Sequence, residues 1–138
     1  MNRTEFQELA KVRLDEAKAL LDQKRFDGAY YLAGYAVECG LKACVAKLTN
    51  QDDFPRDRKF VEKCYSHDFM DLLKASGLLP DWEKDTKADA ALTSNWGIVE
   101  AWNESVRYER CGQAKAQTLY EAISHPTLGV MQWIELRW

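Results

Sequence analysis

The chain has 138 residues, of which 46% are hydrophobic and 30% charged, and its formal net charge at pH 7 is −3. This length is typical of one domain, and the large apolar content excludes intrinsic disorder because burial can offset the entropy of ordering. The acidic balance disfavours sequence-independent binding of a phosphate backbone without excluding it, since a local basic patch still attracts phosphates.

The N-terminus carries acids and no apolar run of signal-peptide length, and no apolar stretch of about 18 residues occurs anywhere. We therefore expect a cytoplasmic protein that does not span a membrane. A reducing cytosol and a domain of this size need no disulfides. We expect four free thiols, two of them in the core: Cys39, Cys44, Cys64 and Cys111.

The first part of the chain predicts two long antiparallel helices. Apolar residues recur every three or four positions from Thr4 to Gln23, and Thr4 with Gln7 fits a capping box. A linker of two or three residues around Lys24 permits only an antiparallel neighbour. The second helix is expected to begin near residues 25–27 and to end near Leu48, where polar residues and Pro55 break it.

Shorter helices are expected in the remainder of the chain. Residues 51–66 predict a loop, the most mobile segment, with a short helical piece near 59–64; residues 67–76 predict a short helix closed by Gly77. Residues 82–92 are expected to be helical, and Thr93-Ser94-Asn95 to cap a further segment from Trp96 to Trp102. After a connection over 105–112, the last helix should begin near residue 113, break at Pro126 and resume over 127–138. No run alternates as a strand does, so the fold class is all-α with a single domain over 1–138.

The second helix is predicted to be the core element. Projected at about 100° per residue, its small residues share one face, which lets a neighbouring backbone approach closely, and most other positions are apolar. The exception is a polar row at positions i, i+4, i+7 and i+11, namely Tyr31, Tyr35, Glu38 and Lys42. Glu38 and Lys42 are spaced to form an ion pair. The row either faces solvent or a neighbour's rim, or it lines a pocket or a dimer seam.

The segment Asp27–Lys42, with the sequence DGAYYLAGYAVECGLK, resembles the central helix of HEPN domains. His67-Asp68, Trp102 with Arg107-Tyr108, and the ending 129–138 resemble further elements of that family. The resemblance implies an up-and-down bundle of four main helices plus short helices. It also implies a homodimer, and a nucleotidyltransferase partner in a toxin–antitoxin or defence system.

Many HEPN proteins are metal-independent ribonucleases that use an Arg followed, after four to six residues, by a His. That motif is absent, since no His follows Arg107 or Arg110 before His125, and eight residues separate Arg58 from His67. What remains resembles the family's variety with an Arg-Tyr pair, which implies a module that binds a nucleotide, RNA or a nucleotidyltransferase partner. Whether the chain is an enzyme stays open.

Two smaller clusters complete the candidate residues. Cys64 and His67 have the spacing of half a zinc site, but the second half is missing, so we expect neither metal nor cofactor. His67 suits a structural hydrogen bond or catalysis. Arg107 and Tyr108, with Arg110, suit a phosphate and a stacked base, or an Arg that pairs with Glu38.

The leading hypothesis is therefore a binding module. Its candidate ligand-binding residues are Tyr31, Tyr35, Glu38, Lys42, His67, Arg107 and Tyr108. The alternative is an unconventional metal-independent ribonuclease that uses His67 or His125 with Arg107. The chain has no glycine-rich phosphate loop and no nucleophile elbow that would favour another enzyme class.

Overall fold

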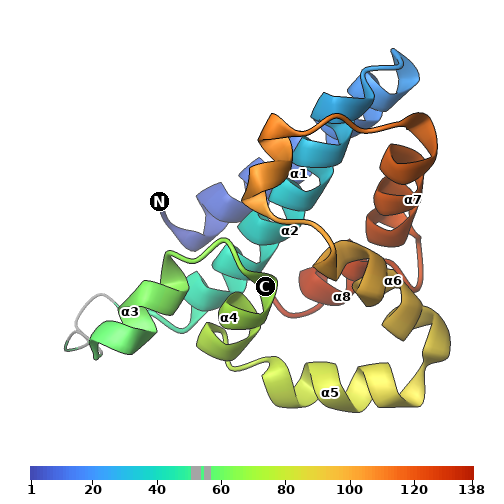
Figure 1. Ribbon diagram of the computed structural model, residues 1–138. Coiled ribbons are helices and arrows are strands. Elements are labelled where there is room, and N and C mark those ends of the chain that lie inside the picture. The colour runs from blue at the N-terminus through green and yellow to red at the C-terminus, as the bar shows by residue number, and fades with distance from the viewer. Residues whose placement is uncertain (51–53, 55–56) are drawn as a thin grey trace.

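A computed structural model describes residues 1–50, 54 and 57–138 of the chain. Its two longest helices, α1 (Arg3–Asp22) and α2 (Phe26–Lys47), lie side by side and antiparallel, as Figure 1 shows. Lys24 makes the tight turn between them with a positive φ of 59°. The predicted extent of α2 and its antiparallel packing on α1 are therefore confirmed.

The start of α1 differs from the prediction. Asn2 is the N-cap, its side chain accepts the Glu5 backbone N–H at 3.0 Å, and the Glu5 carboxylate accepts the Asn2 N–H at 2.7 Å. The predicted capping box of Thr4 and Gln7 is wrong, because Asn2 and Glu5 form the reciprocal box two residues earlier.

Four shorter helices follow in chain order: α3 (Arg58–Cys64), α4 (Phe69–Ala75), α5 (Leu79–Ala88) and α6 (Ala90–Glu100). The short helix within the expected loop and the helix before Gly77 are confirmed, and Gly77 has a φ of 73°, which favours glycine. The part of the predicted loop over residues 51–53 and 55–56 lies outside the described residues.

The predicted boundary at Thr93-Ser94-Asn95 is wrong. The break between α5 and α6 is at Asp89, whose backbone is extended and whose side chain accepts the N–H groups of Ala91 and Leu92 at 2.9 and 3.1 Å. Because Asp89 already caps the helix, Thr93 and Ser94 lie inside α6, where each hydroxyl donates to the carbonyl four residues earlier.

The C-terminal part begins with a short 3₁₀ helix, η1 (Glu104–Tyr108), and continues with α7 (Gln113–Ser124) and α8 (Val130–Glu135). In Figure 1 the orange segment that contains η1 crosses the α1–α2 pair before it reaches α7. The predicted break near Pro126 is confirmed, although the helix resumes at residue 130 rather than 127.

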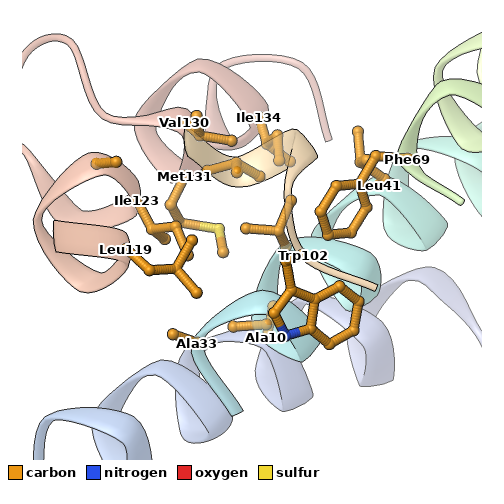
Figure 2. Packing of buried hydrophobic residues seen from close by; sticks show 14 of the residues in the cluster. Ala10, Ala33, Leu41, Phe69, Trp102, Leu119, Ile123, Val130, Met131 and Ile134 are labelled. Carbon is orange, nitrogen blue, oxygen red and sulfur yellow. The ribbon is translucent and has the colours of Figure 1, made fainter. Parts of the chain in front are cut away.

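The core is built around α2, which contacts α1, α4, η1, α7 and α8. Figure 2 shows Trp102 against this helix, with residues of α7 and α8 on one side and Phe69 on the other. Every member of the predicted small-residue face is buried: Ala29, Ala33, Ala36, Gly40, Ala43 and Cys44. No strand occurs in the described residues, so the structure is an all-α bundle, as predicted.

Two further expectations concern bulk properties. Across the described part of the chain, no helix combines the length and the apolar composition that crossing a bilayer requires. None of the four cysteines forms a disulfide within the described residues, and Cys39 and Cys44 are buried, as predicted. The cytoplasmic location stays a prediction.

Candidate functional site

The polar row on α2 has its centre at Glu38, whose carboxylate is buried in the core with 1% of its side chain exposed. Its Oε1 accepts a hydrogen bond from Lys42 Nζ at 2.8 Å and contacts His67 Nδ1 at 2.9 Å. Its Oε2 is buried and has no hydrogen-bond partner within the described residues. A buried carboxylate is costly unless it is paired, so Lys42 and His67 hold the charge in place.

His67 lies in the loop before α4, and 48% of its side chain is exposed. An ionised carboxylate only accepts hydrogen bonds, so the contact with Glu38 assigns the proton to Nδ1 and leaves Nε2 as an acceptor on neutral His67. The structural hydrogen bond that the sequence suggested for His67 is therefore present. Nε2 thus stays available to accept a hydrogen bond.

The N-terminal half of the row is aromatic. The rings of Tyr31 and Tyr35 are parallel to within 2° with centroids 6.1 Å apart, and both are partly exposed. Tyr31 also stacks on Trp102, with centroids 6.1 Å apart, and Trp102 stacks on Phe69 at 5.3 Å. Burial is the main cause that raises the pKa of the Tyr35 hydroxyl, so this residue stays neutral at physiological pH. The buried rings of Trp102 and Phe69 thus fix the orientation of the partly exposed Tyr31 ring.

Arg107 and Tyr108 reach the row from η1. The Arg107 guanidinium lies 4.9 Å from the centroid of the Tyr108 ring, and 79% of Tyr108 is exposed. Hydrogen bonding to Tyr108, and more weakly to Tyr31, raises the pKa of Arg107. The guanidinium therefore stays charged beside the exposed aromatic rings, where it can contact an anion.

The row also continues toward the start of α2, which the sequence reasoning missed. Asp27 lies one turn before Tyr31, accepts the Cys111 backbone N–H at 2.5 Å and pairs with Arg110 Nε at 2.8 Å. Asp27 and Tyr31 are four residues apart, and this spacing could have placed Asp27 on the same face of α2 as the row. Its partners were not predictable, because they are more than 80 residues away in the sequence.

A cavity with a volume of about 330 Å³ opens at the other end of the row. Lys42 forms part of its wall together with apolar side chains of α1, α2 and α3, among them Phe6, Val45 and Val61. The row therefore runs from the polar start of α2 to a mainly apolar cavity at Lys42.

The structure decides between several alternatives. The whole row does not face solvent, because Glu38 is buried, and Glu38 pairs with Lys42 and His67 rather than with an Arg. His125 is not in the row: its Nδ1 accepts the Leu128 backbone N–H at 3.0 Å beyond the end of α7. Within the described residues no group of three or more His, Cys, Asp or Glu could hold a metal ion.

The seven candidate residues therefore come from three parts of the fold and meet along one face of α2. They form two connected groups that adjoin on α2: Tyr31, Tyr35, Arg107 and Tyr108 in one, and Glu38, Lys42 and His67 in the other. In comparisons with known proteins, no family model, no curated protein and no solved structure matches this chain. The site must therefore be interpreted from its own chemistry.

Proposed function

We propose that this protein is a binding module that holds a nucleotide or a short RNA segment against the exposed side of the polar row. The observation that carries the proposal is the pair of parallel rings, Tyr31 and Tyr35, with the Arg107 guanidinium beside Tyr31. A tyrosine ring offers a stacking surface to any base, and a guanidinium donates two parallel hydrogen bonds to a phosphate.

Burial of the supporting groups strengthens the proposal. Trp102 and Phe69 stack behind Tyr31 and are 3% and 5% exposed, so the aromatic surface is ordered before any ligand arrives. Preorganised side chains lose little conformational entropy on binding. At the other end, Lys42 and His67 supply hydrogen-bonding groups whose positions are set by buried Glu38.

Titration calorimetry of the full chain with adenosine monophosphate, uridine monophosphate and a mixed-sequence RNA octamer tests this function. Stacking on an aromatic residue contributes about 1–3 kcal/mol per base. We expect Tyr31→Leu to weaken binding by about tenfold, and Tyr31→Phe, which keeps the ring, to bind like the wild type within about threefold. Arg107→Gln should weaken every phosphate-bearing probe.

Matched controls are available outside the row. Tyr120 on α7 is half-buried like Tyr31, and the Arg58 side chain on α3 is 91% exposed, so Tyr120→Leu and Arg58→Gln repeat the chemical changes at other positions. These variants should bind like the wild type. Absence of binding to all three probes, or equal losses in row and control variants, would contradict the proposed function.

The geometry of His67 favours a second candidate function, a metal-independent ribonuclease. The contact between Glu38 Oε1 and His67 Nδ1 leaves Nε2 able to accept a proton from a ribose hydroxyl, which is the role of a general base. Cleavage of an RNA pool in the presence of a chelator should then be lost in His67→Gln and Arg107→Gln. Cleavage that survives both substitutions would belong to a contaminant and would rule out this reading.

The family resemblance adds proposals about partners that rest on the sequence alone. We propose membership of the HEPN family, a homodimer, and association with a nucleotidyltransferase in a toxin–antitoxin or defence setting. Sedimentation of the full chain at micromolar concentration should give twice the 15.9 kDa mass of one chain. A single species at 15.9 kDa would remove the dimer.

A further inference from the structure

A second cavity, with a volume of about 250 Å³, lies at the start of α2, at the end of the polar row opposite to Lys42. The linker after α1 and the segment after η1 form its walls, with side chains of Lys24, Arg25, Asp27 and Arg110. The ion pair of Arg110 with Asp27 and the hydrogen bond from the Cys111 N–H hold the segment after η1 against α2. The cavity is thus built by two parts of the chain that are far apart in sequence.

This cavity carries a net positive charge. Asp27 neutralises Arg110, whereas Lys24 and Arg25 have no ion pair with any residue that the structure describes. Two cations therefore remain uncompensated on the wall of a polar cavity. Glu109, the acid between Arg107 and Arg110, does not line this cavity. Guanidinium and ammonium groups in such a hollow suit a phosphate.

The cavity lies one helical turn from the aromatic part of the row. Asp27 lies one turn before Tyr31, and the segment from Arg107 to Arg110 runs beside this part of α2, since it contacts both residues. Ten residues of helix separate Arg25 from Tyr35, which is about 15 Å along the axis. A stacked nucleic-acid strand advances about 3.4 Å per nucleotide, so this path is about four nucleotides long when stacked and fewer when extended.

We propose that the cavity at Lys24, Arg25 and Arg110 is a phosphate subsite for a single strand whose bases stack on Tyr31 and Tyr35. The ligand class is then an oligonucleotide of about four nucleotides rather than a mononucleotide, because one nucleotide does not span the roughly 15 Å of helix from Tyr35 to Arg25. This inference rests on the proposed function and extends it to a second subsite.

Fluorescence anisotropy of a labelled tetranucleotide with the full chain, competed by unlabelled strands of one to six nucleotides, tests the inference. We expect the affinity to rise with length up to about four nucleotides and then to level off. The test variant is Lys24→Asn combined with Arg25→Gln. Asparagine tolerates the positive φ of 59° at position 24, so the turn is retained.

This double variant should bind the tetranucleotide at least tenfold more weakly than the wild type and bind the mononucleotide within twofold of it. Its slope of log affinity against log salt should be smaller by about 1.4, the value for two lost phosphate contacts on a single strand. The control Arg58→Gln with Lys59→Gln removes two exposed cations of α3 and should leave both quantities unchanged. Thermal unfolding of each variant checks that the fold is intact.

The outcomes separate the two proposals. Affinity that is independent of length, or a tetranucleotide that binds the double variant as tightly as the wild type, overturns the subsite while the effect of Tyr31→Leu still supports the proposed function. Inorganic phosphate that competes as well as the tetranucleotide shows a simple anion site and also overturns it. No binding by the wild type overturns both. RNA and DNA strands compared at equal length identify which strand is preferred, and tight binding of either supports the inference.

Discussion

Gly34 lies where α2 passes under the indole of Trp102, and its replacement by alanine gives a sharp test of the packing behind the row. A Cβ at this position would lie 2.3 Å from three ring atoms of Trp102, Cδ2, Cε2 and Nε1. The ring is 3% exposed and is held between Tyr31 and Phe69, so it cannot turn aside without breaking both stacks. Gly34→Ala should therefore displace Trp102 and disturb the aromatic surface.

Two opposing effects determine how much Gly34→Ala changes the free energy of unfolding. Overpacking a core costs about 1–3 kcal/mol, and the upper end applies here because the contacted atoms belong to a rigid ring. Alanine gains about 1 kcal/mol over glycine in a helix interior. The net expectation for Gly34→Ala is a loss of about 2 kcal/mol in the free energy of unfolding. At Gly97, in α6, an added Cβ meets nothing within 4 Å, so Gly97→Ala should stabilise the protein, by up to about 1 kcal/mol.

Urea unfolding, followed by tryptophan fluorescence and circular dichroism, measures the free energy of unfolding of both variants. Thermal unfolding measures their melting temperatures. With about 4 °C of melting temperature per kcal/mol for a chain of this size, Gly34→Ala should melt roughly 8 °C below the wild type and Gly97→Ala slightly above it. Binding at the row should also weaken in Gly34→Ala alone. If the two variants have the same stability, the close contact between α2 and Trp102 is not present in solution and the argument for a preordered aromatic surface fails.

Two further predictions concern the free energy of unfolding. Asp85 Oδ2 accepts from Trp133 Nε1 at 2.9 Å and from Arg137 Nη2 at 2.7 Å, so Asp85→Ala should cost about 1–3 kcal/mol in urea unfolding, and Asp85→Asn should cost less. Burial raises the pKa of the Cys39 and Cys44 thiols to about 11, above the unfolded value near 8.5. The unfolded chain therefore loses these protons first, and the free energy of unfolding should fall as pH rises from about 8.5 to 11. A double alanine variant of the two cysteines should show a shallower fall, and parallel pH profiles for the two proteins would contradict the reasoning.

The sequence predicted α2 well because a helix that is apolar almost all round can only be the centre of a bundle. The same projection located the polar row, since side chains at these spacings share a face whatever surrounds them. It also predicted the pair of Glu38 and Lys42, which are four residues apart on one helix.

Contacts between distant segments were not predictable in this way. His67 meets Glu38 across 29 residues, and Trp102 covers Gly34 from another part of the chain, so neither contact has a local signal. The wrong boundary in the second half has a different cause. Thr93 and Ser94 are residue types that favour caps, but their hydroxyls bond carbonyls within α6 because Asp89 already caps that helix.

Glu38 separates a structural role of the row from a functional one. A buried ion pair seldom makes a fold more stable than well-packed apolar residues of similar size would, so stability alone does not explain a carboxylate in the centre of the core helix. Replacing both partners, as Glu38→Met with Lys42→Met, should leave the free energy of unfolding unchanged or higher. In this double variant His67 would still be hydrated, because about half of its side chain is exposed. Its ring would lose the Glu38 carboxylate that orients it. Unchanged stability together with weaker binding or lost cleavage would show that the pair serves the site. A large loss of stability would show instead that Glu38 and Lys42 hold the loop before α4 in place.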